Sequence, residues 1–283
     1  MILEAREVRY TYSDGTAALK EVDLDITKGQ FVVLLGPNGS GKTTLFKVIT
    51  GLIKPLTGEV RVEGRPFDQF SKEDIYRKVG FVFQDPNDQL FAPTVGEDVA
   101  FGPVNLGLSR SEVELRVRDS LDKVGIPNLI NKPIHYLSYG QKKRASIAGV
   151  LAMKPGLMIL DEPTAGLDPA GVREIMRLLV KLNREEGITI LMATHDVDLV
   201  PLYANGIFVL YDGKVVLSGT PQQVFNEKET VRGAGLRLPR VAHLAEILVK
   251  KDSIKIDRLP LTIGEARRMV VSAVKKDETK YGK

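Results

Sequence analysis

The chain has 283 residues, of which 43% are hydrophobic and 27% charged, so it can form one large domain with an appendage or two small domains, and disorder is not expected. The net charge is only +4, and basic residues are interspersed with acidic ones, which gives no indication of nucleic-acid binding. The lack of cysteine excludes a disulfide framework and a thiolate metal site. Because no apolar stretch approaches the length of a membrane span and no signal-peptide pattern is present, we expect any membrane role to depend on a partner.

The N-terminal part of the chain predicts a small antiparallel sheet. Residues 2–10 and 19–26 alternate loosely between apolar and polar side chains, and a turn at residues 13–15 separates them. Tyr12 lies at the end of the first strand or in the turn. It is either an ordinary core or surface aromatic residue or a platform that stacks on a base.

A phosphate-binding loop follows, because residues 36–43 fit the spacing G-x-x-x-x-G-K-[ST]. An unbroken apolar run at residues 31–35 predicts a buried parallel strand before it, and Leu45, Val48, Ile49 and Leu52 recur at helical spacing after it. The unpaired N–H groups of a helix N-terminus attract phosphate. Lys42 would then reach the β- and γ-phosphates, and the Thr43 hydroxyl would ligate Mg²⁺. A chance match in a glycine-rich loop is the alternative, which the flanking strand and helix disfavour.

The segment from Asp85 to Phe91 follows a short apolar strand that ends at Gln84. A loop is the ordinary interpretation, but the adjacent Leu90 and Phe91 are unusual between acidic residues. We expect this pair to form an interaction surface; the alternative is that both side chains pack into a helical region. Residues 71–134 are otherwise mostly helical in pattern, which predicts a helical subdomain inserted at about residues 71–155.

The second half of the chain contains two further buried strands with polar ends. Residues 157–160 are apolar and lead into Asp161 and Glu162, and two carboxylates at the end of a buried strand are costly unless Mg²⁺ or another partner pairs with them. Residues 188–193 end close to His195, which by itself could be incidental. A hairpin with a D-G turn spans residues 207–217. Short helices at 239–250 and 262–276 predict a helical extension over residues 226–283.

These segments, in this order, resemble the ATP-binding cassette (ABC) ATPases over about residues 1–225. More narrowly, residues 85–91 and the C-terminal extension are similar to those of the ATPase subunit of energy-coupling-factor transporters, which import cobalt, nickel or vitamins. The resemblance implies an α/β fold: a P-loop NTPase core with a mixed or parallel sheet, an N-terminal antiparallel β subdomain, the helical insertion and a helical extension that aids dimerisation. It also implies hydrolysis of ATP with Mg²⁺ at the cytoplasmic face of the membrane, with a transmembrane component docking near residues 85–91.

The resemblance assigns roles to the matching residues. Glu162 corresponds to the general base that orients water, His195 to the histidine bonded to the γ-phosphate, and Gln84 to a contact of Mg²⁺ and the attacking water. Mg²⁺ would be held by Thr43, Gln84 and Asp161. The nucleotide itself would be bound by Tyr12, which stacks on adenine, and by Gly36, Asn38, Gly39, Ser40, Gly41, Lys42, Thr43 and Thr44.

Two such subunits sandwich two ATP molecules in this family. Ser138, Gly140 and Gln141 of one subunit would therefore face the ATP of the other, and Asp168 would lie in the turn that crosses between them. The second subunit could be another copy or a paralogue. The usual signature has two glycines, and the first is Tyr139 here, which would be strained if the position needs a positive φ. We expect the position to be tolerant and the Tyr139 ring to point away from phosphate.

Two other functions fit the sequence less well. Cytosolic cassette ATPases that act on DNA or ribosomes usually carry a long coiled-coil insertion or two cassettes, and this sequence shows one cassette and no sustained heptads. A phosphate-loop kinase or GTPase is disfavoured by residues 137–141 and by His195. The resemblance implies that a separate membrane component selects the transported solute.

Overall fold

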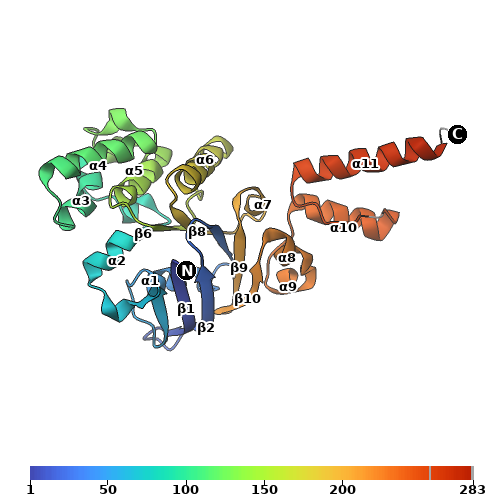
Figure 1. The fold of residues 1–283 in the computed structure, drawn as a ribbon, viewed down its shortest axis with the longest axis horizontal. Helices are drawn as coiled ribbons and strands as arrows, with labels where there is room; N and C mark the ends of the chain where they lie inside the picture. Colours follow the sequence, from blue (N-terminus) through green and yellow to red (C-terminus); the bar gives the residue numbers. More distant parts are fainter. Residues whose placement is uncertain (255, 282–283) are drawn as a thin grey trace.

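The computed structural model describes residues 1–254 and 256–281, which form two sheets with helices around them (Figure 1). A four-stranded sheet has the order β2-β1-β4-β5, and a six-stranded sheet has the order β10-β9-β3-β8-β7-β6. The strands are β1 (Leu3–Thr11), β2 (Ala17–Ile26), β3 (Phe31–Leu35), β4 (Thr57–Val62), β5 (Arg65–Pro66), β6 (Val79–Val82), β7 (Leu157–Asp161), β8 (Thr189–Thr194), β9 (Gly206–Tyr211) and β10 (Lys214–Gly219). The α/β fold class predicted from the sequence is therefore confirmed.

The six-stranded sheet is parallel except for the β9–β10 hairpin. Strand β3 is buried along its whole length. Phe31, Val33 and Leu35 pack into one core cluster, and Val32 and Leu34 pack into the other. Burial on both faces explains the unbroken apolar run in the sequence. The parallel pairing brings the carboxyl ends of β3, β8, β7 and β6 to one edge of the sheet.

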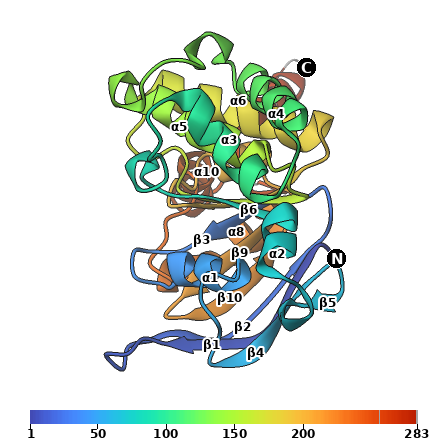
Figure 2. The same ribbon diagram turned by 90° about the vertical axis from the view of Figure 1, so that its left-hand side faces the viewer.

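The predicted N-terminal antiparallel sheet is confirmed and is extended by β4 and β5. Helix α1 (Lys42–Ile49) packs with this sheet and one face of the six-stranded sheet in a shared cluster (Figure 2). The prediction that Leu52 belongs to this helix is wrong, because the helix ends at Ile49 and Gly51, two residues later, has a φ of 74°. The Leu52 N–H bonds back to the Lys47 carbonyl at 2.9 Å, in a glycine-dependent helix end.

Helices gather on the opposite face of the six-stranded sheet (Figure 2). They are α3 (Val95–Asn105), α4 (Arg110–Lys123), α5 (Tyr139–Leu151) and α6 (Pro169–Glu185), whereas α2 (Lys72–Lys78) lies on the same side as α1 (Figure 2). Short 3-10 turns lie at Phe67–Gln69, Pro86–Asp88, Pro127–Leu129 and Ile134–Tyr136. The predicted helical insertion at 71–155 also contains β6, which pairs with β7 in the six-stranded sheet. The segment therefore begins with α2 and with a strand of the core sheet, and only the part after β6 is free of strands.

The C-terminal region begins with α7 (Val200–Tyr203), α8 (Pro221–Asn226) and α9 (Lys228–Gly233) and ends with α10 (Arg240–Asp252) and α11 (Ile263–Tyr281). Helices α10 and α11 extend to one side of the sheets (Figure 1). Val231, Leu238 and Leu261 are buried in the same cluster as the central sheet. The hydrophobic core therefore continues across the predicted domain boundary at residue 225. Helix α11 is longer than predicted, and residues 282 and 283 of the predicted extension lie outside the described part.

The described helices include none that is both long enough and apolar enough to cross a membrane.

Candidate active site

The loop between β3 and α1 is tightly packed against the chain around it. Gly41 has a φ of 103°, and a Cβ atom at this position would lie 2.6 Å from the Ala18 carbonyl. A Cβ atom at Gly36 would lie 2.4 Å from the Leu210 carbonyl. Glycine is therefore required at both positions, because a side chain would displace the backbone that forms the loop.

The side chains of the loop converge on a site suited to an anion. The Lys42 ammonium donates to the carbonyls of Gly36 and Pro37 at 2.8 and 3.0 Å, and burial lowers its pKa. The Ser40 hydroxyl is buried, and no described residue hydrogen-bonds to it. A buried hydroxyl that lacks a partner is costly, so this group fits a site completed by a phosphate.

A hydroxyl and a carboxylate from distant parts of the sequence meet beside this loop. The Thr43 hydroxyl donates to Oδ2 of Asp161, the last residue of β7, at 2.7 Å. Burial raises the pKa of Asp161, and Glu162 adds to the increase, whereas the bond from Thr43 opposes it. Hard oxygen atoms of this kind are the ligands that Mg²⁺ prefers, and Mg²⁺ commonly uses few protein ligands together with phosphates.

Glu162 follows Asp161 and has a left-handed backbone, with a φ of 43°. Its N–H donates to the Ala193 carbonyl of β8 at 3.2 Å. Its carboxylate Oε2 lies 3.1 Å from Nδ1 of His195, which follows the same strand. The Glu162 side chain is 11% exposed and that of His195 is 67% exposed. A largely buried carboxylate is therefore paired with an imidazole that is accessible to solvent.

These groups line one cavity of about 770 Å³ at the carboxyl edge of the six-stranded sheet. Tyr12 lines it as well, and its hydroxyl is hydrogen-bonded to the Thr44 hydroxyl at 2.8 Å. The predicted site residues among its lining are Tyr12, Asn38, Gly39, Gly41, Lys42, Thr43, Thr44, Gln84, Asp161, Glu162 and His195. The topology therefore brings together residues that the sequence spreads over more than half of the chain.

The remaining predicted residues do not line this cavity in the described chain. Ser138 caps α5, accepting from the Gln141 N–H at 3.3 Å while the Gln141 side chain accepts from the Ser138 N–H at 3.0 Å. Asp168 caps α6 by accepting from the Gly171 N–H at 2.8 Å. Gly140 lies in the first turn of α5. Gly36 and Ser40 lie in the phosphate loop but outside the lining.

Tyr139 is accommodated without the backbone strain considered above. It occupies the first turn of α5 and is not among the residues with positive φ. Its ring lies against Gly166, where a Cβ atom would be 2.9 Å from a ring carbon and where φ is 76°. The ring therefore packs on the turn between β7 and α6, where only glycine leaves room for it.

Sequence reasoning missed several residues near the site, among them Thr16, Ala17 and Ala18 of the lining and two charged residues. Asp212 lines the cavity, because the Gly213 N–H donates to the Ser40 carbonyl at 3.1 Å and holds the hairpin tip over the phosphate loop; the D-G pattern indicated only a turn. Lys143 is completely buried, and burial lowers its pKa to about 8 although Asp85, Asp161 and Glu162 oppose this. A lysine on a helix carries no signal in the sequence that would predict its burial.

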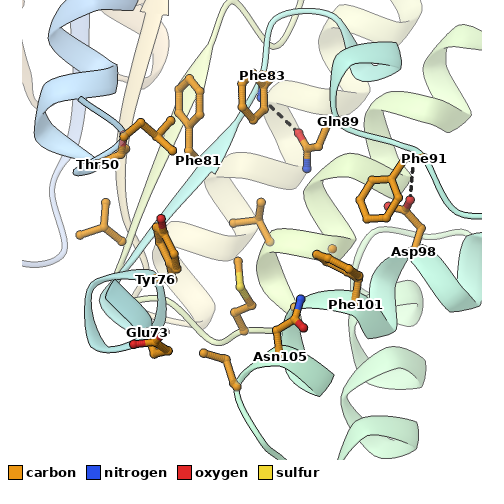
Figure 3. A pocket seen from close by; sticks show the side chains of 17 residues that line it. Thr50, Glu73, Tyr76, Phe81, Phe83, Gln89, Phe91, Asp98, Phe101 and Asn105 are labelled. Atoms are coloured by element: carbon orange, nitrogen blue, oxygen red, sulfur yellow. Dashed lines mark hydrogen bonds between the residues drawn. The ribbon is translucent and has the colours of Figure 1, made fainter. Parts of the chain in front are cut away.

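The expectation that Leu90 and Phe91 form one exposed apolar pair is wrong. Leu90 is only 7% exposed and belongs to the core, whereas Phe91 is 66% exposed. Buried Asp98 accepts from the N–H groups of Phe91 and Ala92 at 2.9 and 3.0 Å, which fixes the turn and sends the two side chains in different directions. Phe91 lines a groove of about 540 Å³ together with Phe81, Phe83 and Phe101 (Figure 3).

The phosphate loop after β3, the carboxylates at the end of β7 and the polar residues that follow β6 and β8 define a P-loop nucleotide hydrolase of the α/β class. Residues 19–165 match the protein family described as ABC transporter. The chain is 55% identical over 276 residues to the energy-coupling factor transporter ATP-binding protein EcfA of Methanocaldococcus jannaschii, covering 97% of this chain and 98% of that protein. It is 51% identical over 274 residues to EcfA2 of Clostridium perfringens, covering 96% of each.

Solved structures agree with these relationships. CbiO1 of Clostridium perfringens, described as part of the ABC transporter complex cbiONQ, superimposes with a TM-score of 0.74 at 51% identity, covering 87% of this chain and 99% of that chain. A dimeric ATP-binding cassette in a post-hydrolysis state with ADP and Pi superimposes with a TM-score of 0.69 at 33% identity, covering 77% of this chain and 98% of that one. The chain belongs to the ABC transporter ATPase family, and it is an enzyme that binds and hydrolyses ATP.

Proposed function

We propose that the chain is the ATP-hydrolysing subunit of an importer of the energy-coupling-factor type, whose solute is a metal ion such as cobalt or nickel, or a vitamin. Similarity over nearly the whole chain to proteins named as subunits of such transporters supports this. The single structural observation that carries the proposal is the cavity in which Lys42, Thr43, Asp161, Glu162 and His195 converge. The chain would act at the cytoplasmic face of the membrane through a transmembrane partner.

The residues of the cavity suggest how each takes part in hydrolysis. Lys42 and the loop N–H groups would bind the phosphates, and Tyr12 would stack on adenine. Thr43, Asp161 and Gln84 would hold Mg²⁺, which when bound neutralises charge on the phosphates. The Glu162 carboxylate would accept a proton from the attacking water and orient it. His195 lies within hydrogen-bonding distance of that carboxylate and would both orient it and contact the γ-phosphate.

A second subunit would complete the site. Ser138, Gly140 and Gln141 lie at the N-terminus of α5, where the helix dipole favours an anion, yet they do not line the cavity of the described chain. We propose that they face the ATP held by another subunit, and that Asp168 lies at the same interface. The partner subunit could be a second copy or a paralogue.

The groove beside Phe91 is our proposed docking site for the transmembrane component. Its walls combine Phe81, Phe83 and Phe101 with the acidic Glu73 (Figure 3). Phe91 and Phe101 pack edge to face at the rim, with ring centroids 4.7 Å apart. A short helix with apolar and basic residues suits such a groove. The groove lies next to the segment that follows Gln84, so a bound helix could respond to the nucleotide state of the cavity.

Co-purification tests the transport role directly. The full chain with an affinity tag, expressed in its native cells, should co-purify with an integral membrane protein after the membranes are extracted with a mild detergent. Recovery of ribosomes or DNA in place of a membrane protein would favour the alternative of a non-transport cytosolic ABC ATPase. Identification of the recovered subunits would also show whether the partner ATPase is a second copy or a paralogue.

A further inference from the structure

A buried lysine joins three functional segments next to the cavity. Lys143 lies in α5, and its side chain is completely buried. Its ammonium donates to the main-chain carbonyl of Gln84 and lies 3.5 Å from the main-chain carbonyl of Glu162. The ring of Tyr139 is its third neighbour, with the ring centroid 5.6 Å from the nitrogen.

The cost of this burial indicates that the charge itself has a purpose. A buried ammonium is strongly unfavourable unless its donors are paired. An apolar side chain of similar length would fill the same space without that cost, and such replacements often leave stability unchanged or raise it. The two carbonyls that Lys143 contacts belong to Gln84 and Glu162, which are both residues of the proposed site.

The backbone of Glu162 needs restraint from its surroundings. A residue other than glycine in a left-handed conformation, as Glu162 is, is strained and persists only when neighbouring contacts hold it. The Ala193 carbonyl binds its N–H, and the Ala165 N–H, three residues along, donates to its carbonyl at 3.0 Å. Lys143 contacts the same Glu162 carbonyl from α5. The N-terminus of that helix carries Ser138 and Gly140.

We propose that Lys143 is a positioning residue for ATP hydrolysis, which ties α5 to the main chain of Gln84 and Glu162 and thereby holds the Glu162 carboxylate in its working direction. This inference rests on the role of Glu162 in the proposed function. Lys143 is not itself among the residues that line the cavity, and its hydrogen bonds go to the main-chain carbonyls of two lining residues and not to the Glu162 carboxylate, so its effect reaches the reaction through the backbone.

The test compares Lys143→Met, Lys143→Gln and Lys142→Met in the full chain with ATP and Mg²⁺. Lys142 is the matched control, because it is the preceding residue of the same helix and donates to the side chain of Asn87 at 2.7 Å. Lys143→Met should lower kcat by about 10²-fold, the effect of a small misplacement of a catalytic group, with an unchanged Kd for a fluorescent ATP analogue. Lys143→Gln keeps one N–H donor and should lose less, and Lys142→Met should behave like the parent.

A double-mutant cycle separates positioning from a general loss of structure. Lys143→Met should cause no further loss in a Glu162→Gln chain, because its effect passes through the Glu162 carboxylate. All kcat values are compared at one temperature, at which thermal unfolding curves show that every variant is folded. A kcat close to that of the parent at this temperature, or an equal loss with and without the Glu162 carboxylate, would overturn the inference. If Glu162→Gln alone retained full turnover, the proposed function of the site would fail instead.

Discussion

Oε2 of Glu162 and Nδ1 of His195 lie 3.1 Å apart, although the two residues follow different strands, β7 and β8. The pairing depends on the parallel register in which Asp161 lies opposite Ala193. Because the register places both residues at the carboxyl edge of the sheet, a carboxylate that can accept a proton and an imidazole that can orient it reach the same cavity.

Replacement of the proposed general base should separate binding from hydrolysis. Glu162→Gln keeps the size of the side chain but removes its basicity, so we expect ATP to bind normally and hydrolysis to slow by about 10²–10⁴-fold. The variant should also dimerise more stably with ATP. Steady-state phosphate release and size-exclusion chromatography with ATP measure the two effects. Near-normal turnover would show that Glu162 is not the base.

A change at the N-terminus of α5 should affect hydrolysis without affecting nucleotide binding by a single subunit. Ser138→Arg introduces bulk where the nucleotide of the second subunit would lie, and Ser138 does not line the cavity of its own chain. We expect an unchanged ATP affinity in the monomer and a loss of hydrolysis. Titration of a dilute sample with a fluorescent nucleotide, beside a turnover assay, provides the measurement. Weaker binding by the monomer would contradict the two-subunit arrangement.

Leu90 and Phe91 form a matched pair for testing the docking groove. Leu90→Ala removes a buried side chain and should lower the free energy of unfolding by about 2–5 kcal/mol. Phe91→Ala removes an exposed one and should cost no more than about 1.5 kcal/mol, the value of its edge-to-face contact with Phe101.

Assembly with the membrane component should depend on Phe91, although its removal costs little stability. We expect Phe91→Ala to retain ATPase activity and to lose pull-down of the membrane component, because an exposed aromatic residue can supply much of the affinity of a docking site. Thermal unfolding and pull-down on the same preparations decide the matter. Retention of the membrane component by Phe91→Ala would exclude the groove as the docking site.

The exposed apolar residues of α10 and α11 should support association without nucleotide. Leu244, Ile263 and Val270 are 54%, 78% and 50% exposed. Truncation near residue 226 is unsuitable as a test, because Val231 and Leu238 belong to the main core. We expect Leu244→Asp combined with Val270→Asp to weaken nucleotide-free association, measured by analytical ultracentrifugation. Leu115→Asp, at a 61% exposed position of α4, is the control, and equal association of both variants would contradict this role.

Acid should loosen the junction between α9 and α10. The Arg232 side chain, and to a lesser degree Lys250, lowers the pKa of buried Glu246 from 4.5 to about 2, although burial opposes this. Because the folded-state pKa lies below the unfolded one, the ion pair stabilises the fold fully above about pH 4.5, and its contribution is lost as the pH falls toward 2.

Glu246→Gln measures this contribution. The variant should be less stable than the parent at pH 7 by about 1.5–3 kcal/mol, the range for a hydrogen bond to a charged group. The difference should shrink between pH 4.5 and 2, which thermal unfolding of both chains over that range would show. A difference that stays constant across this range would contradict a role for the Glu246 charge.

Local sequence was sufficient wherever one segment defines its own structure. The apolar run of β3, the spacing of the loop glycines and Lys42, and the D-G turn of the hairpin each restrict the backbone over a few residues. The two carboxylates after β7 were also recognisable, because charges at the end of a buried strand need a partner. The strand, loop and helix around the phosphate site could therefore be predicted directly from the amino acids.

Outside such segments, contacts between distant parts of the chain determine which side chains are buried. Thr43 and Asp161 are 118 residues apart and meet because β3, β8 and β7 are neighbours. Leu90 and Phe91 are adjacent in sequence, yet Asp98 fixes a turn that buries one and exposes the other. Lys143 is buried because α5 packs against the segments of Gln84 and Glu162. Burial in an irregular segment or on a crowded helix depends on what packs over it, and local periodicity carries no information about that packing.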